Sequence, residues 1–310
     1  MELRYVGRSG LTVSALGLGT LTWGRDTDAE EARGQLRAFV DAGGNFVDIS
    51  PGFGAGAAER VLGELMATDV QRSDLVICGR GGFIQRGETQ LYGSGRGPLF
   101  ESVTRSLQRL GTDYFDVLIV GGPDAATDDE ETACALASLV SSGATRYIGL
   151  ADYPAWRSAR IYQILRERKL PILTALEGEY SLLARGAETE LFPMASALDL
   201  GFFATSALGR GVLTGKYRHS IPPTSRAASE HLASFVDPYL EEHPRRIVEA
   251  VAKAADGLGR TPTDVALGWI LSKPISAAII GARTASQLVA TLAAVEDLPE
   301  LVVQALDDVS

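Results

Sequence analysis

The sequence has few cysteines and histidines, and this scarcity limits the chemistry available to the protein. Its two cysteines, Cys78 and Cys134, are too few for a disulfide framework or a cysteine-rich metal site. All three histidines, His219, His231 and His243, fall within one polar stretch. Chemistry that needs a histidine elsewhere in the fold is therefore excluded, and we expect no bound metal.

The sequence also lacks long apolar runs and an excess of positive charge. No run reaches the roughly 20 apolar residues that a membrane helix needs, and residues 1–10 have no signal-peptide core. The formal net charge is −10, whereas nucleic acids and anionic membranes attract clustered Lys and Arg. We therefore expect a cytoplasmic protein whose partner is a small molecule, with its oligomeric state left open.

Eight short apolar runs recur along the 310 residues, of which 45% are hydrophobic. Most runs are continuous in Val, Ile, Leu and Phe, as expected of parallel strands buried on both faces. They are residues 14–19, 45–50, 75–80, 116–121, 147–152, 174–180, 201–207 and 277–282. Segments with helical periodicity lie between them, at residues 29–42, 57–66, 98–110, 131–141, 155–166, 187–197 and 262–271.

This alternation predicts an α/β fold, a single (β/α)8 TIM barrel domain over residues 1–310. Residues 3–13, with Gly10 in their middle, have the pattern of an N-terminal β-hairpin that covers the bottom of the barrel. Residues 218–243 predict a long surface loop after the seventh strand. The site of such a barrel lies at the C-terminal ends of its strands.

The predicted strand ends supply the candidate site residues. They are Gly19, Thr20, Asp48, Arg80, Gly121, Asp124, Asp152, Glu177, Thr205, Ser206, Gly281, Ala282 and Arg283. Asp48 and Arg80 end neighbouring strands, where an ion pair would be structural or part of a site. Asp152 and Glu177 are either an acid–base pair or solvated loop acids. Trp23, Phe53 and Trp156 are either pocket walls or packing residues.

Two glycine-containing motifs predict an anion site. In GARTASQL (residues 281–288), Arg283 precedes a helix whose N-cap is Thr284 and whose capping-box partner is Gln287. A helix N-terminus beside an arginine suits a phosphate. The segment SALGRGVLTGKY (residues 206–217) follows strand seven, and the loops after strands seven and eight often share one phosphate site. The alternatives are a capped helix with a surface arginine and a flexible lid.

A third motif, GFGAGA (residues 52–57), fits a loose dinucleotide fingerprint after a strand. The acid expected at the end of the next strand is absent, because that strand ends at Arg80. An arginine there suits a 2′-phosphate, so a Rossmann fold remains a weaker alternative to the barrel.

With the strands in place, the sequence resembles the aldo-keto reductases nearly from end to end. The motifs that carry the resemblance are LGLGTLTWG (16–24), NFVDISPGFGAGAAERVLGELM (45–66), SLQRLGTDYFDVLIV (106–120), YIGLADYPAW, EYSLLAR, SALGRGVLTGKY and IIGARTASQL, in the family's order. The resemblance implies a TIM barrel that binds NADP(H) and reduces carbonyl groups.

The resemblance also implies a catalytic tetrad of Asp, Tyr, Lys and His, in which Tyr protonates the carbonyl. Here Asp48 matches, but Phe53, Arg80 and Gly121 stand at the Tyr, Lys and His positions. Arg80 keeps the charge but does not deprotonate at neutral pH. Tyr92, on the loop after the third strand, is the possible substitute donor.

The family's nicotinamide-holding residues are also replaced. Ala151, Asp152 and Glu177 stand where relatives have Ser, Asn and Gln, and Thr205 stands where an aromatic ring stacks. The phosphate and adenine end is retained. The residues that the resemblance assigns to the cofactor are Gly19, Thr20, Asp152, Glu177, Ser206, Leu208, Gly209, Lys216, Gly281, Ala282, Arg283 and Gln287. Trp23 and Phe53 are the expected substrate pocket.

Three functions follow from this pattern. The first is an NADP(H)-binding reductase-family protein whose standard carbonyl reduction is impaired or rebuilt, because a general acid contributes about 10²–10⁴-fold. The second is a non-reducing isomerase, lyase or hydrolase that uses Asp48, Asp152, Glu177 and Arg80. The third is a pseudoenzyme, a non-catalytic NADP(H) sensor that reports the state of the cofactor to another protein.

Overall fold

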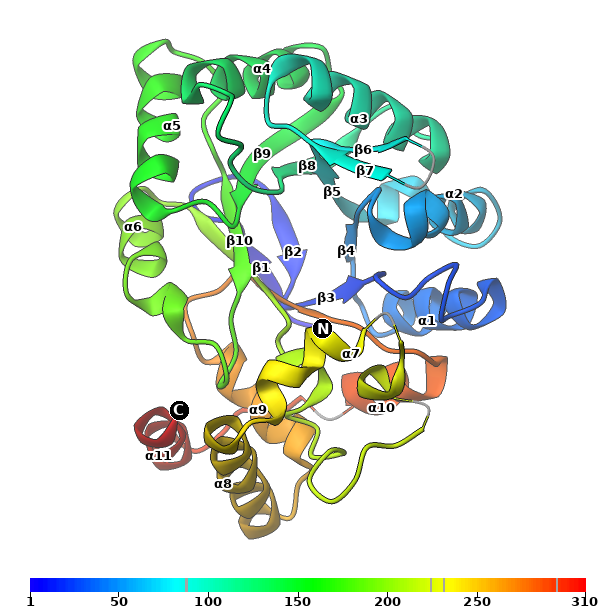
Figure 1. Ribbon diagram of the computed structural model, residues 1–310, viewed down its shortest axis with the longest axis vertical. Helices are drawn as coiled ribbons and strands as arrows, with labels where there is room; N and C mark the ends of the chain where they lie inside the picture. Colours follow the sequence, from blue (N-terminus) through cyan, green and yellow to red (C-terminus); the bar gives the residue numbers. More distant parts are fainter. Residues whose placement is uncertain (87–88, 224, 231, 294) are drawn as a thin grey trace.

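The computed structural model describes residues 1–86, 89–223, 225–230, 232–293 and 295–310. Eight parallel strands form a closed barrel in the order β10-β11-β12-β3-β4-β5-β8-β9 (Figure 1). Their bounds are β3 Leu16–Gly19, β4 Phe46–Ile49, β5 Val76–Gly81, β8 Phe115–Val120, β9 Thr145–Ala151, β10 Ala175–Glu179, β11 Gly201–Thr205 and β12 Ala277–Ile280. Every predicted apolar run overlaps one of these strands, so the barrel prediction is confirmed.

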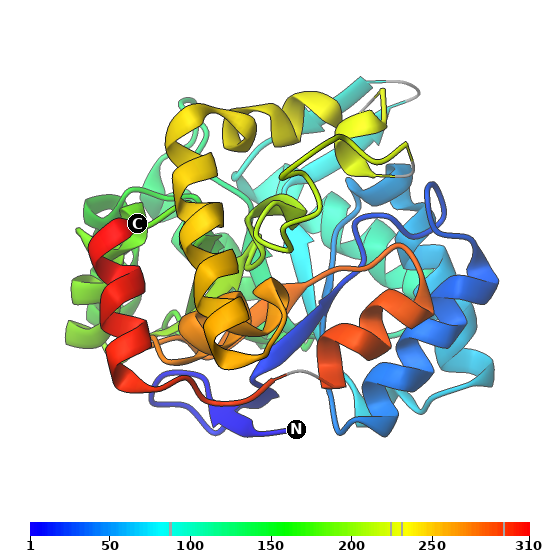
Figure 2. The ribbon, with the colours of Figure 1, turned by 90° about the horizontal axis from the view of Figure 1, so that it is seen from below.

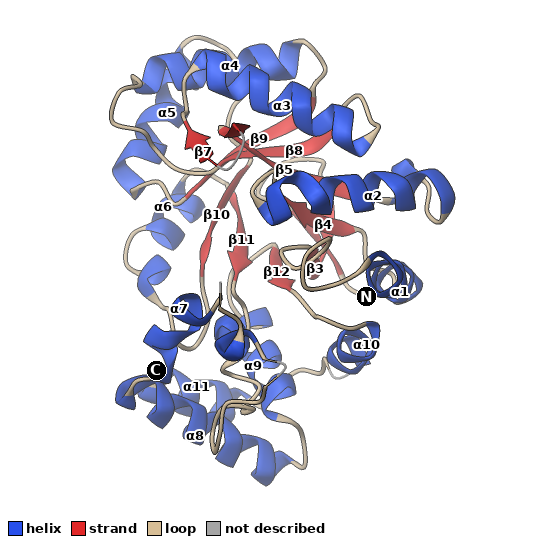
Figure 3. Ribbon diagram, turned by 45° about the vertical axis from the view of Figure 1, so that its right-hand side comes forward, coloured by secondary structure: helices blue, strands red, loops and turns tan. Residues whose placement is uncertain are grey.

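Helices surround the strands on the outside of the barrel (Figure 3). They are α1 Ala29–Asp41, α2 Ala57–Thr68, α3 Arg96–Leu110, α4 Asp129–Ser141, α5 Ala155–Glu167, α6 Leu191–Ala197, α8 Glu242–Leu258, α9 Pro262–Leu271, α10 Ala285–Ala293 and α11 Glu300–Val309. Asp28 caps α1, which buries Leu36 and Phe39 against the core. None of the described helices is long and apolar enough to cross a membrane.

The predicted end of one helix agrees with the structure, and the predicted start of another does not. Helix α3 ends at Gly111, which adopts the left-handed conformation (φ 65°) expected of its C-cap position. Helix α6 is shorter than predicted, because the first part of the predicted segment forms a separate 3₁₀ turn at Gly186–Glu188.

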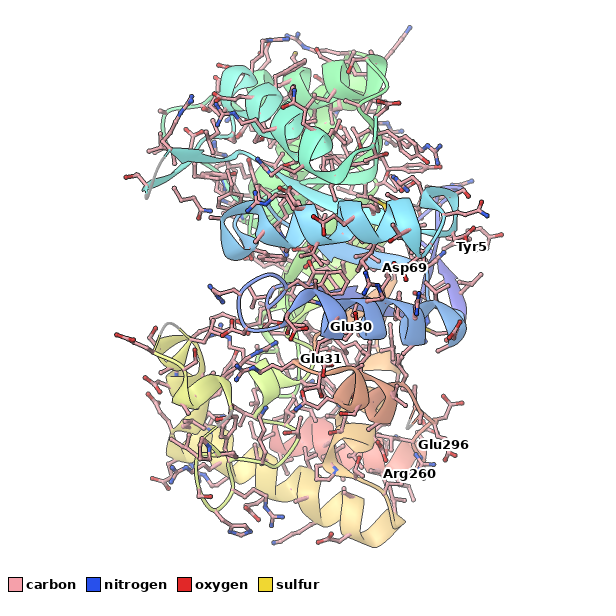
Figure 4. All side chains as sticks on the ribbon, turned by 90° about the vertical axis from the view of Figure 1, so that its right-hand side faces the viewer. Tyr5, Glu30, Glu31, Asp69, Arg260 and Glu296 are labelled. Carbon is pink, nitrogen blue, oxygen red and sulfur yellow. The ribbon has the colours of Figure 1, made fainter. Side chains whose placement is uncertain are left out.

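The N-terminal hairpin closes one end of the barrel, as predicted. Strands β1 (Leu3–Tyr5) and β2 (Thr12–Ser14) pair antiparallel. Val6 and Val13 are fully buried and pack with side chains of the barrel interior. Tyr5 points away from the barrel at this end and is 70% exposed (Figure 4). The hairpin therefore covers the face opposite the one where the C-terminal strand ends meet (Figure 2).

A second hairpin lies at the other end of the barrel, where the sequence predicted only a loop. Strand β5 is followed by β6 (Phe83–Arg86) and β7 (Thr89–Tyr92), which pair antiparallel. Figures 2 and 4 place this hairpin at the same end as the segment that follows β11. The predicted loop after the third strand is thus a structured cover beside the strand ends.

The long segment after β11 is also more regular than predicted. It contains 3₁₀ turns at Arg226–Ala228 and Asp237–Leu240 and the short helix α7 (Ala233–Val236), with Val236 fully buried. The predicted long loop after strand seven is therefore present, and its short turns pack part of it onto the core. His219 and His243 are exposed, and His231 lies outside the described residues.

Arg210 fastens this segment to the barrel. Its guanidinium makes two hydrogen bonds to the Glu179 carboxylate, at 2.9 and 2.6 Å, and a third to the carbonyl of Phe235. It also lies 3.9 Å from the Phe235 ring centroid and 4.8 Å from that of Tyr239. A bidentate arginine–carboxylate pair is stronger than a neutral hydrogen bond, and the two aromatic contacts add to it.

Replacement of Arg210 by Ala is expected to loosen the segment rather than unfold the barrel. The variant loses charged hydrogen bonds, each of which contributes about 1.5–3 kcal/mol after exchange with water is included. Limited proteolysis should cut within residues 218–243 several-fold faster than in the wild type, with little change in circular dichroism. Equal cleavage rates in the two proteins would contradict the anchoring role.

Candidate active site

Three charged side chains from three different strands meet inside the barrel. Asp48 on β4, Arg80 on β5 and Glu177 on β10 come together near the C-terminal strand ends, and Asp48 and Glu177 are only 3% and 2% exposed. The Arg80 Nε lies 3.6 Å from Asp48 Oδ1, and its Nη2 is in contact with Glu177 Oε1. The predicted Asp48–Arg80 pair is thus present, and Arg80 reaches across the barrel to Glu177 as well.

Burial shifts the ionisation of this cluster. Desolvation raises the pKa of Asp48 against the opposing effect of Arg80. Desolvation, opposed by Arg80 and reinforced by Asp48 and Asp152, raises the pKa of Glu177 to about 8. Burial disfavours the charged Arg80, but Glu177 and Asp48 outweigh it and raise the pKa of the guanidinium. Two carboxyls therefore share one fixed positive charge, and at neutral pH the cluster retains a proton that we assign to Glu177.

The same cluster has donor atoms that a metal ion could use. Ligand atoms of Asp48, Cys78 and Glu177 lie within 4.8 Å of one another, and all three residues are buried. The Arg80 guanidinium already pairs with both carboxyls, and desolvation raises the pKa of the Cys78 thiol well above its ordinary value. A protonated thiol beside a fixed cation does not fit a divalent metal ion.

The raised pKa of Glu177 predicts a stability that depends on pH. Between the unfolded pKa of 4.5 and the folded value of about 8, the folded state holds a proton that the unfolded state has released. The free energy of unfolding therefore falls as pH rises through this window, with a slope of at most about 1.4 kcal/mol for each pH unit. Glu177→Gln removes this contribution, so its Tm should fall less than the wild-type Tm between pH 5 and 8.5. Parallel Tm curves for the two proteins would refute the assignment.

Position 53, where the resemblance places a phenol, holds a half-buried phenylalanine. Phe53 begins a 3₁₀ turn (Phe53–Gly56) after β4 and packs against the core. The next three residues, Gly54, Ala55 and Gly56, all have positive φ angles, between 52° and 82°. Ala55 is strained in this conformation, which is consistent with a backbone held in place by its surroundings.

The position of the family's histidine is filled from another strand. A Cβ atom added at Gly121 would lie 2.4 Å from the ring of Phe83 on β6. The Phe83 ring packs on Tyr92 of β7 with centroids 4.8 Å apart. The Tyr92 hydroxyl donates a hydrogen bond to the carbonyl of Gly122. The second hairpin thus occupies the space that a side chain at position 121 would need.

Tyr92 reaches the strand ends, as expected of a substitute donor, but its proton is engaged. Burial and the neighbouring Tyr153 and Asp124 raise its pKa well above the ordinary value. A phenol that already donates to a backbone carbonyl and ionises only with difficulty is poorly suited to give up its proton. The structure therefore brings Tyr92 to the predicted place with an unfavourable environment.

The other two strand-end acids differ sharply from each other. Burial opposes ionisation of Asp124, yet hydrogen bonds from Thr127, Ser94 and Ala126 lower its pKa to about 2. This carboxylate organises a turn. Asp152 has a φ of 55°, and partial desolvation of its carboxyl, reinforced by Glu179, raises its pKa despite the opposing Arg80. Only Asp152 of the two interacts with the Arg80 cluster.

The three aromatic residues predicted as pocket walls or packing residues lie in different environments in the structure. Trp23 is fully buried, and its indole N–H donates to Gln35 at 2.9 Å, so it packs in the core between the β3 end and α1. Trp156, in the first turn of α5, is 64% exposed. Phe53 is the member of the set that stays half-buried, in the turn that follows the end of β4.

The predicted anion site contains three cations from two strand-end loops. The side chains of Lys216, Arg226 and Arg283 lie close enough to repel one another. Partial burial, together with Arg226 and Arg283, lowers the pKa of Lys216, although Tyr217 opposes this shift. Burial and Arg283 lower the pKa of Arg226, against Tyr217 and Asp26. An anion bound among these side chains would relieve the repulsion.

Backbone glycines bring these cations close to the strand ends. A Cβ at Gly281, just after β12, would lie 3.3 Å from an Arg226 Nη atom, and one at Gly211 would lie 3.1 Å from Lys216 Nζ. Arg226 was not among the predicted site residues, because it lies in the polar segment that we interpreted as a surface loop. Arg226 lies nine residues beyond Tyr217, and no local sequence pattern predicts that it approaches Gly281.

The helix end beside Arg283 is partly occupied by a carboxylate. Gln287 N–H bonds to the Thr284 hydroxyl as predicted, but the Gln287 amide oxygen accepts from Arg283 N–H instead of completing a capping box. Glu31 of α1 accepts the N–H of Ala285 at 2.6 Å (Figure 4). The anion site therefore depends on side-chain cations more than on free N–H groups of α10.

The remaining predicted cofactor residues lie around the same strand ends. The hydroxyl of Thr20 donates to the carbonyl of Asp48 at 2.9 Å, and the carbonyl of Ala282 accepts from Thr22 and Gln35. Gly19, Ser206, Leu208 and Gly209 complete the set, and Ser206 and Gly209 have positive φ angles of 55° and 53°. These residues shape the backbone at the ends of β3, β11 and β12, and their side chains carry no charge.

The closed eight-stranded parallel barrel with helices on its outside places the chain in the TIM-barrel class, whose sites lie at the C-terminal strand ends. The chain belongs to the aldo/keto reductase family, whose model matches residues 15–310. The resemblance inferred from the sequence is therefore confirmed.

Curated relatives cover nearly the whole chain. It is 32% identical to a probable voltage-gated potassium channel subunit beta of Oryza sativa subsp. japonica, covering 100% of this chain and 95% of that protein. The identity is also 32% to the protein of the same name in Arabidopsis thaliana, with the same coverage. An L-glyceraldehyde 3-phosphate reductase of Escherichia coli is 32% identical over 96% of this chain and 88% of that protein.

Proposed function

We propose that this protein binds NADP(H) at the C-terminal strand ends and that its carbonyl reduction proceeds without the family's phenol. The observation that carries the proposal is the cluster of Lys216, Arg226 and Arg283, in which three cations lie near one carboxylate, that of Asp26, 3.8 Å from Arg283 Nη2. The dinucleotide carries phosphates of the required charge, and when bound it supplies a hydride. The family membership and the reductase named among the relatives support the same function.

Different residues of this chain would serve cofactor binding and carbonyl reduction. Lys216, Arg226 and Arg283 would hold phosphate groups through charged hydrogen bonds. Ser206, Leu208, Gly209 and Gln287 would lie along the nucleotide. Phe53 would offer the substrate an apolar wall in place of a proton. A rebuilt catalytic centre, and not the family's tetrad, would then supply the proton that carbonyl reduction needs.

Equilibrium titration tests the binding half directly. Fluorescence or calorimetric titration should give a sub-millimolar Kd for NADPH and weaker binding of NADH, because a 2′-phosphate adds a charge that the cations recognise. Raising the ionic strength should weaken NADPH binding more than NADH binding. Absence of NADPH binding at millimolar concentration would refute the proposal.

A second candidate is a non-catalytic NADP(H) sensor. Two relatives are named as potassium channel beta subunits, which makes a role alongside another protein a reasonable alternative for this chain. The missing phenol at position 53 favours it too. A sensor should bind NADPH and change its assembly with the cofactor, whereas it should show no turnover on any carbonyl compound.

A further inference from the structure

A cavity of about 580 Å³ lies at the end of the barrel that the N-terminal hairpin closes, beside the N-terminal ends of β9 and β10. Its volume falls within the range of small-molecule sites, about 300–1,000 Å³. None of the residues that line it belongs to the cationic cluster of Lys216, Arg226 and Arg283. We propose that this cavity is a second binding site, for a phosphate monoester with an apolar body.

Three arginines line the cavity, in a protein whose formal net charge is −10. They are Arg8 in the turn of the N-terminal hairpin, Arg146 on β9 and Arg166 in the last turn of α5. The acidic residue among the described lining residues is Asp199, 3.6 Å from Arg8. Two positive charges remain, which match a phosphate monoester, because it carries about −1.5 to −2 at pH 7. Guanidinium groups bind phosphate oxygens through paired hydrogen bonds.

These arginines retain the capacity to bind a ligand. None of the described residues forms an ion pair or a hydrogen bond with the guanidinium of Arg166. The ion pair of Arg8 is exposed to solvent, so it stabilises the protein little and can be exchanged for a ligand. Arg146 lies 3.1 Å from Asp116, but Asp116 is also paired with Arg72, so its single charge is shared. One arginine is therefore positioned in advance, and the other two are available to a phosphate group.

Two tyrosines add hydroxyl groups to the cavity lining. Tyr162 lies one turn before Arg166 on α5 and is 7% exposed, and Tyr147 on β9 is half-buried. Among the described residues, neither hydroxyl has a hydrogen-bond partner. Buried polar groups normally have one, and an oxygen of a bound phosphate would supply it.

Most of the remaining lining is apolar, which favours an organic ligand over an inorganic ion. These side chains come from α4, β9 and the segments that precede β10 and β11, and they are Val140, Ile148, Pro171, Ile172, Leu173 and Leu198. Ile172 is 44% exposed, so apolar surface remains uncovered in the free protein. An inorganic phosphate would use the arginines alone, whereas a ligand with an apolar body would also remove this surface from water.

The hairpin wall of the cavity is already in place without a ligand. Gly7 has a φ of 55°, and a Cβ atom added there would lie 2.2 Å from the carbonyl oxygen of Asp199. The N–H of Arg8 donates to the same carbonyl at 2.9 Å. The turn therefore rests directly on the segment between α6 and β11. A wall that needs no ordering on binding reduces the cost of binding.

Calorimetric titration with phenyl phosphate tests this site. The titration uses Arg226→Ala protein without dinucleotide, so that the cationic cluster at the other end of the barrel contributes little. Phenyl phosphate should bind with a millimolar or lower Kd. Inorganic phosphate, phenol and benzoate should each bind at least about 10-fold more weakly, because they lack the ring, the phosphate and the second charge respectively. Absence of phenyl phosphate binding, or inorganic phosphate bound as tightly, overturns the proposal.

Three further substitutions locate the bound phenyl phosphate. Arg166→Ala should weaken its binding about 10- to 100-fold, since a hydrogen bond to a charged group is lost, and Tyr162→Phe should weaken it about 2- to 10-fold. Arg160→Ala is the matched control, because Arg160 is also on α5 but pairs with Asp129 at 3.4 Å, outside the cavity. The control should leave the Kd within about twofold. Equal weakening by Arg160→Ala and Arg166→Ala overturns the proposal, because binding then reflects net charge alone.

The two proposed sites are separated by a second titration. The NADPH Kd of Arg166→Ala should stay within about twofold of the wild-type value, since the sites lie at opposite ends of the barrel. A loss of NADPH binding as large as the loss of phenyl phosphate binding overturns the assignment of a second site. Because phenyl phosphate binding is measured without dinucleotide, failure of the proposed NADP(H) function would leave that result unchanged.

Discussion

Replacement of Arg226 by Ala should weaken NADPH binding about 10- to 100-fold. The guanidinium lies over Gly281 at the end of β12, beside Lys216 and Arg283. A hydrogen bond to a charged group contributes about 1.5–3 kcal/mol, and 1.4 kcal/mol corresponds to a factor of ten in Kd. The free protein should be no less stable, since the substitution also removes the repulsion that lowers the pKa of Lys216.

The control for this prediction is Arg218→Ala in the same segment. Arg218 pairs with Glu249 on the surface, at 2.7 Å, and lies outside the cationic cluster. Its removal should leave the NADPH Kd within about twofold, as is usual for an exposed ion pair. If the two variants weaken binding equally, the effect comes from net charge, and the specific role of Arg226 is wrong.

Introduction of histidine at position 121 should destabilise the protein and should not restore the family's centre. A Cβ there would lie 2.4 Å from the ring of Phe83, so the ring or the strand end must shift. Overpacking of this kind costs about 1–3 kcal/mol, which chemical denaturation measures as a lower midpoint. Gly97→His is the matched control, because a Cβ at Gly97 meets nothing within 4 Å. That variant should stay within about 0.5 kcal/mol of the wild type.

The double variant Phe83→Ala with Gly121→His separates steric conflict from other causes. If Phe83 fills the space, the double variant should be more stable than the sum of the two single effects by about 0.5–3 kcal/mol. Additive effects would mean that the hairpin β6–β7 can move aside at no cost. The hairpin would then not be the reason that position 121 carries no side chain.

The sequence predicted the barrel because its signal is local. Each strand is a continuous apolar run followed by a helix with one apolar face, and α3 ends at the glycine expected to end it. The two strands β6 and β7 were missed because Gly-rich flanking residues hide a short hairpin, and its apolar face becomes apparent only when Phe83 meets Gly121. That contact joins residues 38 positions apart, so the hydrophobic periodicity of the sequence does not predict it.

The sequence identified most residues of the candidate site, but it did not predict which of them contact one another. From strand order, Asp152 and Glu177 formed one pair and Asp48 and Arg80 another. The structure joins Arg80 on β5 to Glu177 on β10, which are not neighbouring strands. An eight-stranded barrel is narrow enough for a long side chain to cross its interior. Arg226 was missed for a similar reason, since only the folded segment brings it to β12.

The most direct test of NADP(H) binding at the strand ends is a crystal structure of the protein with NADPH bound. We predict that phosphate oxygens lie within hydrogen-bond distance of Lys216, Arg226 and Arg283, with the nicotinamide over the barrel mouth near Glu177 and Phe53. A dinucleotide bound away from the strand ends, or phosphates that touch none of the three cations, would contradict it.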